Sequence, residues 1–269
     1  MNVAISIFTE SFADYAIQMY KSFRLFDQTT HLIAGSIDLN RSTIDRLKRM
    51  DIEVRHSKTQ VFPKHLCMCD LTMLDYLDGV KWDHIMWIDA DTVLLRPVSH
   101  LFEMPYDYIG HPADIVSGEF TFPSPLRSPL TRRSVDGVLV ETDRWGYHYD
   151  MGLWVTDSYS LLKDFYDLLQ CNINAWYEGD ICSQLINMSY SNYQLDGYKW
   201  SLGSQHGSLL KFNNGKVTYD YDGHTFEPYQ FGFSRTTTGE RLSNPAIESF
   251  IAWHRIGPRN EHVCNIAYQ

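Results

Sequence analysis

The sequence predicts an α/β protein with a mixed, mainly parallel central sheet flanked by helices, an insertion loop and a small antiparallel part near its end. Three observations support this prediction. Strand-like and helix-like segments alternate through the first 95 residues, as in parallel sheets covered by helices. A chain of 269 residues with 44% hydrophobic content is large enough for one sizeable core. Residues 197–245 are rich in aromatic, glycine and polar residues, which favours short antiparallel strands.

The first half of the chain supplies the alternating elements. The apolar spacing from Phe12 to Phe23 is helical, and Asn40 or Ser42 can cap the second helix. We expect Asp78-Gly79 to end the third helix. The predicted elements are strands at 2–8, 31–37, 52–57 and 84–95, and helices at 10–26, 41–50 and 64–77.

Regular patterning fades from residue 111 to 150 and then resumes. The segment 111–137 has four prolines and three arginines, Arg127, Arg132 and Arg133, and is too long for an ordinary connection. We expect an insertion that acts as a lid or a binding loop. We therefore predict one domain, in which an insertion at 111–149 separates the segments 1–110 and 150–269. The later predicted elements are a strand at 151–157, helices at 158–170 and 179–190, and a strand or short helix at 247–257 that leads into a glycine turn.

The charge of the chain limits its partners. The net charge is −10 and the pI is about 5.5, which argues against nucleic acid, since that affinity depends on Lys and Arg. No apolar stretch reaches about 18 residues and no signal peptide is visible, so we expect a cytoplasmic protein without a membrane span.

Two carboxylates interrupt an apolar strand in the segment IMWIDADTVLLRP, residues 85–97. Asp89 and Asp91 follow the apolar run of the fourth strand, and ligands of such sheets bind at the carboxyl ends of strands. Desolvated carboxylates are costly unless they are paired, and hard oxygen ligands suit Mg²⁺ or Mn²⁺. The alternative is a strand that simply ends at Asp89 with both acids solvated. A second pair, Asp220 and Asp222, lies in a predicted hairpin turn, where aspartate is common, and we assign it no role.

The segment WIDADTVLL also resembles the Asp-x-Asp-x-Thr motif of haloacid-dehalogenase phosphatases. That family places the motif on its first strand and needs a late acidic pair for Mg²⁺. Here three strand–helix units come first, and GDICSQ has glutamine where the second acid should stand. We therefore keep the phosphatase as a less favoured alternative.

A broader resemblance is to GT-A glycosyltransferases of family 8, the glycogenin-like enzymes. The segment FPKHLCMCDLTMLDYLDGVKWDHIMWIDADTVLLRPVSHLFEMP resembles the family's core: a lysine that opens a helix, a strand that ends in Asp-x-Asp, and a Leu-Phe before a proline turn. YDMGLWVTD resembles its Asn-x-Gly strand, with Asp150 in place of the asparagine. EGDICSQLIN resembles its Asp-Gln helix start, with Gln184 displaced. AWHRIGPRN resembles its His-x-x-Gly-x-x-Lys motif, with Asn260 where the lysine should stand.

The resemblance implies a Rossmann-like GT-A fold with a nucleotide-binding half at 1–110, a lid or acceptor-binding loop at 111–149 and an acceptor-side half at 150–269. It also implies a set of site residues. It assigns the metal, Mn²⁺ or Mg²⁺, to Asp89, Asp91 and His254, and the catalytic roles to Asp150 and Asp180. Alternatives remain for single residues: His254 as a structural residue, Tyr15 as a core aromatic, Lys64 as an exposed lysine and Asp180 as a helix cap. The nucleotide-sugar site that it implies consists of Phe8, Thr9, Tyr15, Lys64, Asp89, Ala90, Gly152, Gly257 and Arg259.

The activity that the resemblance implies is transfer of a hexose or pentose from a nucleotide-diphosphate sugar to a glycan or other hydroxyl acceptor. Among such donors we favour a UDP-sugar. Family 8 enzymes retain anomeric configuration. An inverting GT-A enzyme with Asp180 as general base is the alternative. A non-catalytic sugar-binding protein is a further one, because aromatic side chains make up 14% of the chain.

Overall fold

The computed structural model describes residues 1–57, 66–112, 128–133, 139–147, 149–171, 178–200, 202, 208–221, 223–233 and 244–256. The helices are η1 (Glu10–Phe12), α1 (Ala13–Phe26), α2 (Arg41–Arg49), η2 (Leu66–Thr72), α3 (Met73–Leu77), η3 (Ser99–Glu103), α4 (Tyr159–Cys171), α5 (Glu178–Ser189), α6 (Gly197–Trp200) and α7 (Pro245–His254). The strands are β1 (Asn2–Phe8), β2 (His31–Ser36), β3 (Glu53–His56), β4 (His84–Ile88), β5 (Thr92–Leu94), β6 (Tyr108–Pro112), β7 (Ser128–Arg133), β8 (Leu139–Gly146), β9 (Tyr149–Thr156), β10 (Asn192–Gln194), β11 (Leu210–Asn213), β12 (Lys216–Tyr221), β13 (His224–Phe226) and β14 (Gln230–Gly232).

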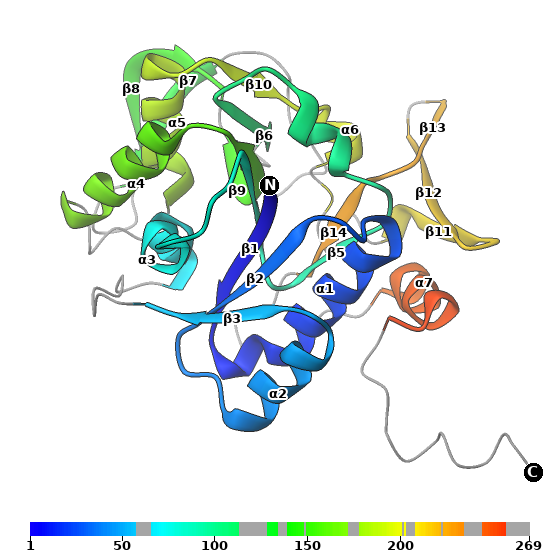
Figure 1. Cartoon of the computed structure of the whole chain (residues 1–269). Coiled ribbons are helices and arrows are strands. Elements are labelled where there is room, and N and C mark those ends of the chain that lie inside the picture. Colours follow the sequence, from blue (N-terminus) through cyan, green and yellow to red (C-terminus); the bar gives the residue numbers. More distant parts are fainter. Residues whose placement is uncertain are drawn as a thin grey trace, which may run out of the picture.

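A seven-stranded sheet forms the centre of the molecule, in the order β10-β6-β9-β4-β1-β2-β3 (Figure 1). Strands β3, β2, β1 and β4 run parallel, whereas β9 runs antiparallel to both of its neighbours, β4 and β6. The prediction of a mixed, mainly parallel sheet is therefore confirmed. Because β4 and β6 are both antiparallel to β9, the carboxyl ends of β1, β4 and β6 share one edge of the sheet with the start of β9.

Helices cover both faces of this sheet. Successive side chains of a strand point to opposite faces, and the strands carry apolar side chains on both. Ala4 and Met86 point to one face, where α1 packs with Tyr20 and Phe23. Val3, Ile5 and Ile7 point to the other face, where α3, α4 and α5 pack. A third apolar cluster joins β5, the strands β11–β14 and α7, and it forms the core of the small antiparallel part.

One predicted strand is wrong, and two open alternatives are decided. The predicted strand 84–95 is two strands: β4 ends at Ile88, the chain turns at residues 89–91, and β5 leaves the main sheet to pair with β14. The final segment is helix α7, and its C-cap is Arg255 in the left-handed conformation (φ 55°) rather than a glycine. Asn40, and not Ser42, caps α2 by accepting a hydrogen bond from the amide of Thr43.

The predicted insertion contains regular structure. Strands β7 and β8 pair as an antiparallel hairpin, and β8 contacts α5. The sequence missed this hairpin because prolines and scattered charges hide its alternation. Residues 113–127, which include Arg127, lie outside the described ranges, so the lid prediction remains a prediction.

Candidate active site

The turn from Asp89 to Asp91 connects the central sheet to the small antiparallel part. The amide of Asp89 donates a hydrogen bond to the carbonyl of Gly152 on β9 (2.7 Å), and the carbonyl of Asp91 accepts one from the amide of Phe233 (3.1 Å). The amide of Thr92 closes the turn on the carbonyl of Asp89 (3.1 Å). Residues outside the turn thus hold the backbone of both acids in place.

The carboxyl group of Asp89 lies among other acids. Its Oδ1 accepts a hydrogen bond from the indole of Trp87 (3.0 Å). Burial raises the pKa of Asp89 well above its usual range, and the negative charges of Asp91, Asp150 and Asp70 raise it further. This carboxylate is therefore costly to ionise until a cation arrives.

Asp150 and Gly152 approach the turn from the start of β9. Asp150 Oδ1 accepts a hydrogen bond from the amide of Gly152 (2.7 Å). A Cβ atom at position 152 would lie 2.9 Å from Asp150 Oδ1 and 3.3 Å from Asp89 Oδ2. Glycine at this position therefore leaves room for both carboxylates beside the backbone of β9. Its role in this structure is close approach rather than a left-handed backbone.

Two residues near the acidic turn were missed in the sequence. Asp70 on η2 is buried, and burial raises its pKa to about 8. Its Oδ1 accepts a hydrogen bond from the amide of Leu71 (2.9 Å), and the side chain of Trp154 lies close enough to its carboxyl group to lower that pKa. His111, at the carboxyl end of β6, is buried with Nε2 3.8 Å from Asp150 Oδ1. A lone acid inside the apolar run LCMCDLTML was the available signal for Asp70.

The predicted nucleotide residues divide into two groups. Phe8 and Ala90 are buried in the core that α1 covers, so their side chains pack. Thr9 follows β1, and its hydroxyl is 2.9 Å from that of Ser11. The ring of Tyr15 lies 6.4 Å from that of Phe233, the residue whose amide binds the Asp91 carbonyl. Phe233 thus contacts Tyr15 through its ring and the acidic turn through its amide.

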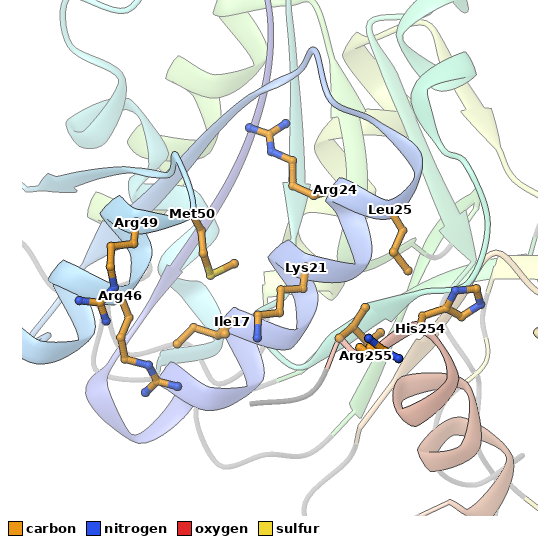
Figure 2. A pocket seen from close by; sticks show the side chains of 10 residues that line it. Ile17, Lys21, Arg24, Leu25, Arg46, Arg49, Met50, His254 and Arg255 are labelled. Carbon is orange, nitrogen blue, oxygen red and sulfur yellow. The ribbon is translucent and has the colours of Figure 1, made fainter. Parts of the chain in front are cut away.

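His254 lies at the end of α7, in a different environment. Its Nε2 is 3.0 Å from the carbonyl of Gly215, in the turn between β11 and β12. Its ring also lines a cavity with Lys21 and Arg24, and none of the three strand-end aspartates is among that cavity's described lining residues (Figure 2). Within the described ranges, no three His, Cys, Asp or Glu side chains are grouped so as to hold a metal. In this conformation His254 therefore does not complete a three-ligand site with Asp89 and Asp91.

Other predicted residues are only partly described. Lys64, Gly257 and Arg259 lie outside the described ranges. Asp180 lies in the first turn of α5, and its side chain is outside the described part. One helical turn later, the hydroxyl of Ser183 accepts a hydrogen bond from the amide of Tyr149 (2.9 Å). The start of α5 therefore lies beside the start of β9, where Asp150 stands.

The second acidic pair has a different setting. Asp220 is a residue of β12, where its carboxylate binds Lys211 Nζ and Thr225 Oγ1, both at 2.6 Å. These partners lower its pKa. Asp222 lies outside the described residues. An exposed carboxylate that already has a cationic partner is a poor candidate for a metal ligand.

The donor set at the acidic turn fits a hard divalent cation. Asp89 and Asp91 offer carboxylate oxygens, the ligand type that Mg²⁺ and Mn²⁺ prefer. The negative charges of Asp91, Asp150 and Asp70 make ionisation of Asp89 costly. A cation at the turn would relieve that cost. Two protein carboxylates with water or substrate oxygens are sufficient for such ions.

Comparison with known proteins gives the fold. No family model and no curated protein matches the sequence. A crystal structure of galactosyltransferase LgtC with donor and acceptor sugar analogues is similar over 95% of this chain and 96% of its own, with a TM-score of 0.59 and 9% identity. An active-site mutant of LgtC is similar over 93% and 94%, with a TM-score of 0.60 and 9% identity.

A third structure, the bifunctional glycosyltransferase WbbM without ligands, is similar over 96% of this chain at a TM-score of 0.62 and 14% identity. This chain spans 50% of the WbbM chain. At these identities the likeness concerns the fold, and the comparisons agree on it. The chain has a GT-A glycosyltransferase fold that resembles family 8.

Proposed function

We propose that this protein is a divalent-cation-dependent glycosyltransferase that moves a hexosyl or pentosyl group from a UDP-sugar to a hydroxyl of a glycan or other acceptor, with retention of configuration. One observation carries the proposal. The turn at Asp89–Asp91 stands at the carboxyl edge of a GT-A sheet, with Asp150 and the sterically required Gly152 beside it. Ligands of open α/β sheets bind at this edge.

The reaction breaks the bond between the anomeric carbon and the diphosphate and forms a bond from the acceptor oxygen to that carbon. The acceptor proton leaves, and negative charge develops on the diphosphate. A cation held by Asp89 and Asp91 would supply Lewis-acid stabilisation of that charge. The assignment of His254 as a third ligand remains part of the proposal and requires the end of α7 to bring its ring to the aspartates, since they are not grouped in this conformation.

The protein's own groups have separate tasks in this proposal. Asp150, fixed by the Gly152 amide, is assigned to the sugar, and Asp180 at the start of α5 is assigned to the acceptor. If the enzyme inverts instead, Asp180 is the candidate base. Tyr15 and Thr9 contribute to the base pocket after β1. Lys64, Gly257 and Arg259 are assigned to the diphosphate by the family resemblance.

A thermal-shift screen tests the proposal. The full chain is heated with UDP-, GDP- and ADP-sugars, with and without Mn²⁺, and product formation is followed by chromatography. A donor that binds only the native state raises its melting temperature, so we expect one nucleotide class to stabilise the protein only with Mn²⁺. The matching nucleoside monophosphates should have a smaller effect. If no donor binds or is consumed with Mn²⁺, the proposal fails, and release of inorganic phosphate would favour the phosphatase alternative.

A further inference from the structure

A cavity lies between α1, α2 and the end of α7, with a volume of about 620 Å³ (Figure 2). We propose that it binds a phosphorylated small molecule, at a site separate from the acidic turn. A volume of this order is typical of small-molecule sites, which run from about 300 to 1,000 Å³. The cavity is concave, so it suits a compact ligand better than the surface of a lipid bilayer.

The charge of this cavity is opposite to that of the chain. The protein has 33 acidic and 23 basic residues, yet its described lining residues include no acid. Five cationic residues from three elements line it: Lys21, Arg24, Arg46, Arg49 and Arg255. A local cluster of this kind is the requirement for binding a phosphate in an otherwise acidic protein.

Two of the arginines already have partners. Arg24 donates to the carbonyls of Thr30 (2.8 Å) and Asp27 (3.4 Å), so it holds the chain after α1. Arg46 forms an ion pair with Asp14 (3.0 Å). These contacts fix the walls of the cavity and use part of the charge of their guanidinium groups.

The guanidinium groups of Arg49 and Arg255 are available to bind a phosphate group. Neither forms an ion pair or a side-chain hydrogen bond within the described ranges, and both residues are exposed. Arg255 is the C-cap of α7 in a left-handed conformation, which glycine would adopt at lower cost. An arginine at this position places a cation opposite the face of α2 that carries Arg49.

The floor of the cavity is apolar. Ile17 and Ile256 are buried beneath the cations, and Met50 is partly buried beside them. Leu25 is 40% exposed at its rim. A bare phosphate ion would use only the cations, whereas a phosphorylated sugar or nucleoside also places a ring against the apolar floor. We therefore assign the site to a phosphate ester with a ring, rather than to a free ion.

Calorimetric titration tests this assignment. The full chain is titrated without metal, in chelator, with inorganic phosphate, pyrophosphate, a hexose 6-phosphate and a nucleoside monophosphate. We expect at least one phosphate ester to bind more tightly than inorganic phosphate, and its affinity to fall with added salt. The double variant Arg49→Gln/Arg255→Gln should weaken it by at least about tenfold, because two charge-assisted contacts are lost.

The matched control is Arg41→Gln/Lys48→Gln, which removes the same charge from exposed positions of α2 that do not line the cavity. It should keep the wild-type affinity within about twofold, since a charge pair at a distance is screened by salt. Equal melting temperatures would show that both variants fold. These titrations use neither donor nor metal, so they stand apart from the test of the transferase activity.

Three results would overturn the assignment. One is wild-type protein that binds none of the phosphate esters. Another is an affinity that both double variants weaken equally, or that neither changes. The third is binding to anionic lipid vesicles, lost in Arg49→Gln/Arg255→Gln, without binding of any soluble phosphate ester, which would make the cavity part of a membrane-binding surface.

Discussion

At the scale of single residues, the acidic turn depends on the absence of a side chain at Gly152. Its amide donates a hydrogen bond to the Asp150 carboxylate, and its carbonyl accepts one from the backbone amide of Asp89, at 2.7 Å each. Oxygens of both carboxylates lie close to the position that a Cβ atom would take at residue 152. A side chain there would separate them, although the hydrogen bonds of β9 could persist.

Gly152→Ala should weaken cation binding by about tenfold, or roughly 1.4 kcal/mol, because the new Cβ would press on Asp89 and Asp150. The measurement is Mn²⁺ titration by calorimetry. Gly232→Ala is the control, since a Cβ at position 232 would meet no atom closer than the Leu202 carbonyl oxygen at 4.0 Å. If both variants bind Mn²⁺ alike, the close approach at Gly152 has no part in the cation site.

Asp70 should make the protein less stable as pH rises. Its pKa is about 8 in the folded protein, against 3.8 as the usual value. The folded state then holds one more proton than the unfolded state, so the free energy of unfolding falls by up to about 1.4 kcal/mol per pH unit between those values. The stabilisation is fully present below pH 4 and is lost as pH rises through 8.

Asp70→Asn should therefore be more stable than wild type at pH 8, with little difference at pH 4. Urea unfolding at several pH values, in chelator, checks this. A parallel pH dependence in both proteins would show that Asp70 is ionised in the folded state at neutral pH.

At the scale of elements, α7 and the β11–β12 hairpin hold His254 through the Gly215 carbonyl. The position of α7 therefore determines whether the histidine can reach a cation. Trp253 strengthens this contact, because its ring packs against Phe212 of β11 at 5.9 Å. A change at this helix end affects both the hairpin and any ligand that draws the histidine away.

His254→Ala should change the affinity for Mn²⁺ alone by less than about twofold, since the ring is not grouped with the aspartates in this conformation. In the presence of UDP, the same variant should bind Mn²⁺ about tenfold more weakly, as expected for loss of one ligand worth roughly 1.4 kcal/mol. Calorimetry with and without UDP gives both values. A large loss without nucleotide would place His254 at the cation in the free protein.

The second acidic pair, Asp220 and Asp222, should be dispensable. Asp220→Asn with Asp222→Asn should leave transfer within a few-fold of wild type, because Asp220 serves an exposed contact with Lys211. Solvent screens exposed pairs of this kind, so they contribute little to stability. Initial rates and melting temperatures check this, and lost Mn²⁺ binding would mean that the wrong acidic pair was chosen.

At the scale of the whole molecule, the sequence predicted the sheet better than the site. The apolar runs at 2–8 and 31–37 specify buried parallel strands by themselves, and both appear within one residue of the predicted ends. The split between β4 and β5 was missed, because Thr92–Leu94 is apolar whether it continues β4 or pairs with β14. Local patterning cannot choose between two tertiary partners.

The site shows the same division. Asp89 and Asp91 were visible as acids within an apolar strand, and β9 brings Asp150 close to Asp89. Asp70 and His111 were missed because their proximity depends on how η2 and β6 meet the sheet. The basic cavity was also missed, since Lys21, Arg49 and Arg255 come from three distant segments.

In the described part of the chain, no helix has the length and apolar character to cross a membrane.

The rate of UDP-sugar turnover by wild type and Asp91→Asn, each with Mn²⁺ and with excess chelator, tests the central claim most directly. One carboxylate charge about 4 Å from the cation, at an effective dielectric of about 20, is worth up to about 4 kcal/mol, which is close to three decades of rate. We predict that loss for Asp91→Asn with an unchanged melting temperature, and a comparable loss for wild type in chelator. Full wild-type activity in excess chelator, or an active Asp91→Asn variant, would contradict the account.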